Sequence, residues 1–146
     1  NQGPEGHRKN YCGPDMMKNE INALIQSRPF HQWLGLEVTD VGEGHVEITA
    51  RWRSEWIVNP DGNYIHGGIL ASLVDLGADW ALFSHTGRGV PTIDLRVDYH
   101  AAARGNLRVI GTVLKAGRRI SSAEAKVFDE SGKLVASGRG VYQTGE

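Results

Sequence analysis

Residues 66–79 read HGGILASLVDLGAD, and this stretch decides the fold. The helix that it predicts is apolar on nearly every side, so we expect it to be buried in the core. Two carboxylates, Asp75 and Asp79, interrupt the apolar pattern four residues apart, which places both on one helix face. Because an aspartate is rarely buried unless it is paired or functional, we expect this helix to carry a site as well as the core.

The predicted helix begins directly after His66-Gly67-Gly68. The first turn of a helix leaves backbone N–H groups without partners and carries the positive end of the helix dipole, which suits an anion or an oxyanion. A glycine at that position lets a ligand approach the backbone closely. The segment therefore predicts an oxyanion site and, about two turns further on, an acid. If Asp75 and Asp79 are both partly buried, their repulsion should raise the pKa of one of them.

The composition is typical of a single globular domain, with 146 residues of which 40% are hydrophobic and 23% charged. A formal net charge of −1 gives no reason to expect a nucleic-acid partner. The single cysteine, Cys12, suits a reducing compartment, so we expect a cytoplasmic protein. No apolar run reaches the ~18 residues of a membrane span, so no membrane partner is expected. We expect residues 1–15 to be disordered or foreign to the native protein, and residues 16–146 to form one domain.

The remaining pattern predicts a first helix, two strands, the central helix and four more strands. The expected elements are a helix at 16–27 capped by Asp15, strands at 36–41 and 45–53, the central helix at 67–85, and strands at 92–100, 105–115, 119–128 and 133–143. Long antiparallel strands need an apolar object on one face, and the apolar helix is the best candidate. We therefore expect an α+β hotdog fold, in which an antiparallel sheet wraps around a central helix.

Several segments of the chain resemble one known family. They are Asn59, HGGILASLVD at 66–75, TIDLRVDY at 92–99, AARG at 102–105 and GKLVASGRG at 132–140. Together they are similar to the phenylacetate-degradation-type (PaaI-like) hotdog acyl-CoA thioesterases, over about residues 34–143. One departure is visible: the loop between Asn59 and His66 is a residue longer than in these relatives. Asn63 is therefore a possible substitute for Asn59.

The resemblance implies a role for each residue of the motifs. The backbone N–H of Gly67 binds the thioester carbonyl oxygen, and Asp75 of the neighbouring subunit acts as general base or nucleophile. Asn59 holds the water or the carbonyl, and Thr92 places a hydroxyl close to Asp75. The candidates for substrate binding are His66, Gly68, Asp79, Asn63 and, toward the phosphates of CoA, Arg118 and Arg119. A homodimer with shared active sites, assembled further into a dimer-of-dimers tetramer, is implied, and no cofactor is expected because CoA is part of the substrate.

Each candidate residue also has a structural interpretation. Asp75 could bind backbone donors of a loop, and Asp79 could be exposed. His66 could cap the helix, Asn59 could only shape a turn, and Thr92 suits the start of a strand without any function.

The other residue types give no prediction of a different kind of catalytic site. The aromatic residues Trp52, Trp56, Tyr64 and Trp80 could line an acyl pocket or only pack in the core or a dimer contact. No HxxxH or CxxC spacing indicates a metal site. Ser72 and Ser84 lack the sequence context of a serine-hydrolase nucleophile.

The sequence thus predicts an acyl-CoA thioesterase, with two alternatives left open. One is a non-catalytic acyl-CoA-binding hotdog module, although such a module has no need of a costly acid at position 75. The other is a hotdog hydratase or dehydratase, whose Gly-Asp-x-Asn-Pro-x-His loop the order Asn59-Pro60-Asp61-Gly62 does not match. Aryl, hydroxyphenylacetyl and medium-chain acyl groups all stay open, as do direct attack by water and an anhydride intermediate.

Overall fold

The computed structural model describes residues 14–145. The elements in chain order are α1 (Pro14–Gln26), α2 (Pro29–Trp33), β1 (Leu36–Gly42), β2 (His45–Ala50), the short 3-10 helix η1 (Ser54–Trp56), α3 (Gly67–Thr86), β3 (Thr92–Tyr99), β4 (Leu107–Lys115), β5 (Ile120–Phe128) and β6 (Leu134–Gln143). The expectation for residues 1–15 therefore falls, apart from Pro14 and Asp15, outside the described residues.

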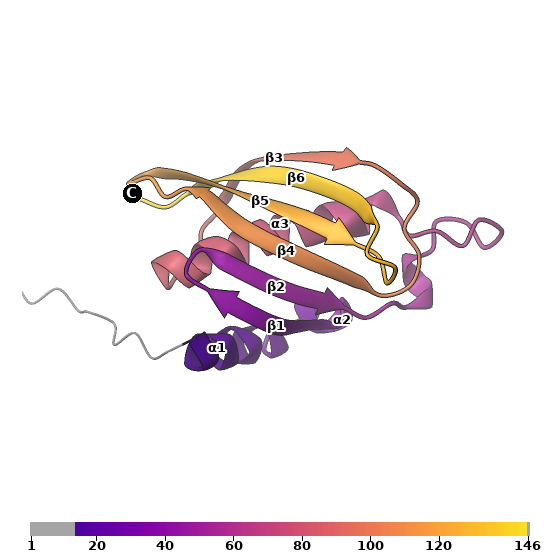
Figure 1. Ribbon diagram of the computed structural model, residues 1–146, viewed down its shortest axis with the longest axis horizontal. Coiled ribbons are helices and arrows are strands. Elements are labelled where there is room, and N and C mark those ends of the chain that lie inside the picture. The colour runs from indigo at the N-terminus through magenta and orange to yellow at the C-terminus, as the bar shows by residue number, and fades with distance from the viewer. Residues whose placement is uncertain (1–13, 146) are drawn as a thin grey trace, which may run out of the picture.

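The six strands form one sheet in the order β1-β2-β4-β5-β6-β3, and every neighbouring pair is antiparallel. Helix α3 lies along one face of this sheet, mainly against β4, β5 and β6, while α1 packs beside β1 (Figure 1). The predicted α+β hotdog arrangement, a curved antiparallel sheet around one central helix, is confirmed.

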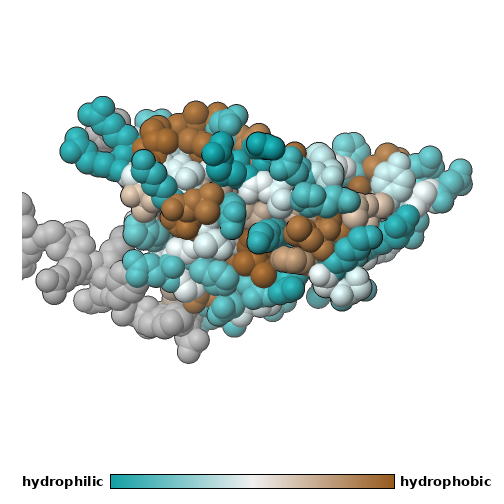
Figure 2. Space-filling model, turned by 45° about the horizontal axis from the view of Figure 1, so that its top comes forward, coloured by the Kyte–Doolittle hydropathy of each residue, from teal (hydrophilic) through white to brown (hydrophobic). Residues whose placement is uncertain are grey.

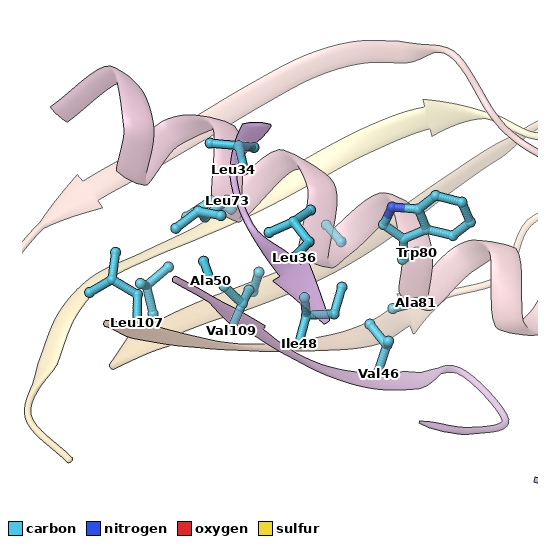
Figure 3. Close-up of a cluster of buried hydrophobic side chains, with 14 of the residues drawn as sticks. Leu34, Leu36, Val46, Ile48, Ala50, Leu73, Trp80, Ala81, Leu107 and Val109 are labelled. Atoms are coloured by element: carbon cyan, nitrogen blue, oxygen red, sulfur yellow. The ribbon is translucent and has the colours of Figure 1, made fainter. Parts of the chain in front are cut away.

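The core lies between α3 and the concave face of the sheet. In β2 the side chains of Val46, Ile48 and Ala50 are buried and alternate with partly exposed ones, as the period-two pattern predicts. Side chains of β1, β2 and β4 converge on Leu73 and Ala81 of α3 (Figure 3). The helix is therefore held to the sheet by a continuous apolar layer.

Glycines set the distance between α3 and the sheet. A Cβ atom built on Gly111 of β4 would lie 2.0 Å from the carbonyl oxygen of Gly77 in α3. A Cβ atom on Gly77 would lie 2.5 Å from Cγ1 of Val109, and one on Gly138 of β6 would lie 2.7 Å from Cγ1 of Val74. The helix backbone therefore lies directly on the sheet, which places its aspartates within reach of side chains from β3 and β6.

Most differences from the predicted elements are at their ends. Helix α1 begins at Pro14, so Asp15 lies inside the helix instead of capping it. The second strand ends at Ala50, not at residue 53, because its pairing with β1 and β4 ends there, opposite Leu36 and Leu107. Helix α3 ends at Thr86, one residue later than predicted, and Gly87 caps it in the left-handed conformation (φ 71°).

The surface carries apolar groups as well as charge. The face drawn in Figure 2 shows hydrophobic patches among hydrophilic side chains. Strand β3 forms one edge of the sheet, and Ile93 and Tyr99 on it are more than half exposed. Within residues 14–145, no helix is long and apolar enough to cross a membrane.

Replacing Gly111 by alanine should destabilise the fold, because the added methyl group would collide with the backbone of Gly77. We expect the free energy of unfolding to fall by about 1–3 kcal/mol, the usual cost of overpacking, measured by urea denaturation. Gly89→Ala is the matched control, since a Cβ atom there meets nothing within 4 Å. Equal stabilities of the two variants would contradict the close contact.

Candidate active site

The carboxylate of Asp75 is held by two hydroxyl groups. Its Oδ1 atom accepts a hydrogen bond from Oγ1 of Thr92 at 3.0 Å and another from the hydroxyl of Tyr142 at 3.0 Å. Within the described residues, Oδ2 has no hydrogen-bond partner, and the side chain is only partly buried. The structure therefore confirms the predicted closeness of Thr92 to Asp75 and leaves one carboxylate oxygen free to act as a base.

The register between β3 and β6 places both hydroxyl groups beside the same carboxylate oxygen. Thr92 begins β3, and Tyr142 is its direct partner across the β3–β6 pair. Both strands lie under the middle of α3, where Gly138 allows the helix to approach closely. The carboxylate and its two donors thus come from three separate elements that the fold brings together.

Tyr142 was not predicted from the sequence as a site residue. Its ring is fully buried, and the charge of Asp75 lies beside its hydroxyl. Burial first, and then the charge of Asp75, raise the pKa of Tyr142, so its hydroxyl stays a donor. The sequence does contain a pattern that could have indicated this residue: in the alternation of β6, Tyr142 shares the inward face with Gly138 and Gly140.

The second acid of α3 is electrostatically coupled to the first. Burial, and then the charge of Asp75, raise the pKa of Asp79 to about 7. The positive charge of Arg28 and a hydrogen bond from the backbone of Val90 oppose this rise. The expectation that one acid of the pair has a raised pKa is confirmed, and Asp79 is the acid concerned.

The start of α3 has one backbone donor occupied and one free. Nδ1 of His66 accepts a hydrogen bond from the N–H of Gly68 at 2.8 Å, so His66 caps the helix, as its structural interpretation states. The N–H of Gly67 has no partner among residues 14–145. The carbonyl oxygen of Gly67 accepts a hydrogen bond from the hydroxyl of Tyr99 at 2.9 Å. Gly67 therefore presents the free donor, whereas the donor of Gly68 is already used.

The free donor and the free carboxylate oxygen are separated within one chain. Gly67 and Asp75 lie eight residues apart on a regular helix, which corresponds to about 12 Å along its axis. A base and an oxyanion donor that act on one carbonyl group must both lie within about 3 Å of the reacting atoms. One chain by itself therefore does not assemble the predicted site.

Asn59 and Asn63 lie in a loop that projects beyond the start of α3 (Figure 1). Oδ1 of Asn59 accepts a hydrogen bond from the N–H of Asp61 at 3.0 Å, and its carbonyl oxygen accepts from Gly62 and Asn63. Asn63 adopts a positive φ of 51°. Asn59 thus shapes a turn, as its structural interpretation predicts, and neither asparagine is hydrogen-bonded to Asp75 or Gly67.

Arg118 and Arg119 lie in the exposed connection between β4 and β5. The carbonyl oxygen of Arg119 accepts a hydrogen bond from the N–H of Thr144, close to the described C-terminal end. This end of the sheet is opposite the projecting loop in Figure 1. Within one chain, the two arginines are therefore not brought together with Gly67.

The tryptophans divide between the core and the surface. Trp56 and Trp80 are buried, whereas Trp52 and Tyr64 are partly exposed. Trp80 contacts the ring of His31 edge-on, with centroids 5.9 Å apart, and the guanidinium of Arg28 lies 5.1 Å from its centroid. Trp56 and Trp80 thus have the core role that the sequence left open.

A cluster of potential metal ligands and a surface groove both lie outside the group formed by Asp75, Thr92 and Tyr142. Asp40, His45 and Glu47 bring potential metal-ligand atoms within 4.8 Å of one another, a group that no sequence spacing indicated. Glu47 is already paired with Arg108 at 2.8 Å. A groove of about 560 Å³, lined by side chains of α1, α2, β1 and residues 51–55, contains neither Asp75 nor Gly67. The site is therefore defined by the chemistry of α3 and not by a single-chain cavity.

Asp79→Asn should change how stability depends on pH. The folded protein binds an extra proton between the ordinary pKa of 3.8 and the raised value of about 7. The wild type should therefore lose stability as the pH rises from about 4 to about 7 and then level off, because the unfolded chain gives up this proton first. The variant lacks this loss. The free energy of unfolding of the variant minus that of the wild type should therefore be greater at pH 8 than at low pH, by on the order of 3 kcal/mol.

Urea denaturation at about pH 4.5 and about pH 8, at one protein concentration, measures this difference. Asp40→Asn, at an exposed position on β1, is the control. An Asp79→Asn effect that is the same at both pH values would show that the side chain does not hold a proton in the folded protein.

Known proteins are similar to this chain in sequence and in fold. The sequence profile of the thioesterase superfamily matches residues 62–136. The medium/long-chain acyl-CoA thioesterase YigI of Salmonella typhimurium is 26% identical over 138 residues, covering 84% of this chain and 89% of that protein.

Comparison with solved structures identifies the same superfamily. An X-ray structure described as a protein from the thioesterase superfamily is 41% identical, with a TM-score of 0.85, and covers 88% of this chain and 98% of that one. The Escherichia coli PaaI protein from the phenylacetic acid degradation operon has a TM-score of 0.79 over 89% of this chain and 94% of its own, and at 19% identity it supports the fold alone. The chain belongs to the thioesterase superfamily.

Proposed function

We propose that this protein hydrolyses an acyl-CoA thioester to a free acid and CoA, with Asp75 as the catalytic carboxylate. The observation that carries the proposal is the geometry of Asp75, whose Oδ1 is held by Thr92 and Tyr142 while Oδ2 is free. Membership of the thioesterase superfamily and the similarity to YigI, which is named an acyl-CoA thioesterase, support this activity.

The reaction needs an activated nucleophile and a place for negative charge. Oδ2 of Asp75 takes a proton from water as the water attacks the thioester carbon, or attacks that carbon itself to form an anhydride that water then cleaves. The N–H of Gly67 at the positive end of α3 binds the carbonyl oxygen as it becomes negative. In the first route the C–S bond breaks after water has added to the carbonyl carbon; in the second it breaks as the anhydride forms, before water cleaves the anhydride. In both routes the thiolate of CoA leaves and takes up a proton.

The two groups come from different subunits in this proposal. Because one helix separates Gly67 from Asp75 by about 12 Å, a second copy of the chain supplies one of them. The exposed edge of β3 offers backbone groups and apolar side chains for pairing with that copy. A homodimer is thus the smallest active unit, and its further assembly into a dimer-of-dimers tetramer stays a prediction.

The other predicted residues have supporting roles. His66 occupies the N–H of Gly68 and so leaves the donor of Gly67 to the substrate. Asn59 and Asn63 lie in the loop that leads into Gly67 of their own chain, whereas Arg118 and Arg119 lie at the far end of the sheet. We propose that the arginines contact the phosphates of CoA.

Asp79 lies one turn beyond Asp75 and touches the substrate or tunes its neighbour. The acyl group stays open between aryl, hydroxyphenylacetyl and medium-chain groups, and cytoplasmic location remains an expectation.

Asp75→Asn should abolish turnover and leave binding largely intact. The amide keeps the size and the Oδ1 acceptor of the side chain but is neither a base nor a nucleophile, so we expect kcat to fall by about 10²–10⁴-fold. Thiol release from a panel of acyl-CoA thioesters measures kcat, and calorimetric titration measures binding. Asp40→Asn is the control.

The outcomes separate the hypotheses. Undiminished turnover in Asp75→Asn would contradict the proposed mechanism. Binding without turnover by the wild type, for every thioester in the panel, would instead identify a non-catalytic acyl-CoA-binding module.

Two inactive variants should restore activity when their subunits are mixed. Gly67→Pro removes the N–H donor at a helix position that tolerates proline, and His66 has the extended backbone that precedes a proline (φ −58°, ψ 133°). A heterodimer of Gly67→Pro and Asp75→Asn contains one complete site, so random mixing should recover about a quarter of wild-type activity.

Gly67→Ala is the matched control, because it adds the same Cβ atom near Tyr99 but keeps the donor. It should keep more activity by itself than Gly67→Pro, because its N–H donor is intact. If the mixture stays inactive although heterodimers form, the site is not shared between subunits.

A further inference from the structure

The hydroxyl of Tyr142 contacts one residue at two points. It lies 3.0 Å from Oδ1 of Asp75 and 3.0 Å from the backbone carbonyl oxygen of the same residue. A donor that bridges the side chain and the main chain of one residue restricts the rotation of that side chain about its Cα–Cβ bond. The contact therefore fixes the direction in which the carboxylate of Asp75 points.

The surroundings of Tyr142 fit it closely to this position. A Cβ atom on Gly140, two residues earlier on the same face of β6, would lie 2.3 Å from Cε2 and from the hydroxyl oxygen of Tyr142. Only a glycine at this position leaves room for the ring to fold back along the strand. On the other side, Thr92 is the cross-strand partner of Tyr142 and donates to the same Oδ1.

We propose that Tyr142 is a positioning residue for the hydrolysis, which directs Oδ2 of Asp75 toward the water and the thioester. This proposal rests on the proposed function, because it gives Asp75 the catalytic role. Tyr142 acts through Asp75 alone: its ring is fully buried, and its hydroxyl faces the carboxylate.

This arrangement identifies the reacting oxygen. Both donors lie on Oδ1, so the reacting oxygen is Oδ2. The charged and titratable groups around this carboxylate are Tyr142 itself, Asp79 on the same helix face, and Arg28, which acts on Asp79. Removal of the hydroxyl should therefore lower kcat and change KM little.

Tyr142→Phe tests the proposal with little risk to the fold, because the ring is kept and the carbonyl of Asp75 remains in its helix. We expect kcat to fall about 10- to 100-fold, which is the effect of one hydrogen bond to a charged group, and KM to change less than about threefold. The loss should persist when kcat is expressed per folded protein, because the ring keeps the fold while the carboxylate loses its direction.

The folded fraction of each variant should be measured by circular dichroism under the assay conditions, so that kcat refers to folded protein only. Ser84→Ala is the matched control, since Ser84 is another buried hydroxyl of α3, which accepts a hydrogen bond from the N–H of Gly44 in the β1–β2 turn at 2.9 Å. It should lower stability and leave the kcat of the folded protein unchanged.

Gly140→Ala provides a second, independent route to the same defect. The added methyl group must displace the ring of Tyr142, so this variant should show the same loss of kcat with little change of KM. Its effect should add little to that of Tyr142→Phe, because both variants remove one interaction.

The outcomes distinguish the two proposals. A wild-type kcat for Tyr142→Phe, with Asp75→Asn inactive, would overturn the positioning role and leave the proposed function in place. A loss of stability with an unchanged kcat of the folded protein would show that Tyr142 is only structural. An active Asp75→Asn would instead overturn the proposed function.

Discussion

The close contact between α3 and the sheet is the constraint on which the rest of the structure depends. Gly77 and Gly111 meet with no room for a side chain, and Gly138 on β6 leaves room for the side chain of Val74. Because the helix lies so close, the short side chain of Asp75 reaches hydroxyl groups on two strands. A larger separation would leave a partly buried carboxylate without partners, which is costly.

The same helix also separates the two parts of the chemistry. Its first turn offers the free N–H of Gly67, and its middle carries Asp75, about 12 Å away. A rigid helix cannot bring its own ends together, so a site that needs both groups must combine two chains. In the proposed mechanism, catalysis and assembly are therefore linked by the length of α3, and loss of the proposed dimer would remove activity without any change in the catalytic residues.

Much of this account could be predicted from the sequence, and the rest could not for physical reasons. The apolar run around Asp75 and Asp79 identified the buried helix, and the raised pKa expected in the pair is present, with burial as its larger cause and repulsion second. Tyr142 was missed because strand periodicity gives the face of a residue but not the ring direction, which depends on Gly140. The strand after residue 45 was predicted too long because alternation continues into residues 51–53, beyond the end of the pairing with β1 and β4.

The central claim, that one subunit polarises the thioester and the other attacks it, is tested most directly by a crystal structure with an acyl-CoA analogue whose thioester sulfur is replaced by methylene. The account predicts that the carbonyl oxygen lies about 3 Å from the backbone nitrogen of Gly67 in one subunit. Oδ2 of Asp75 from the other subunit should face the carbonyl carbon, directly or through one water. An analogue bound with its carbonyl beside groups of a single chain, or beside Oδ1, would contradict the account.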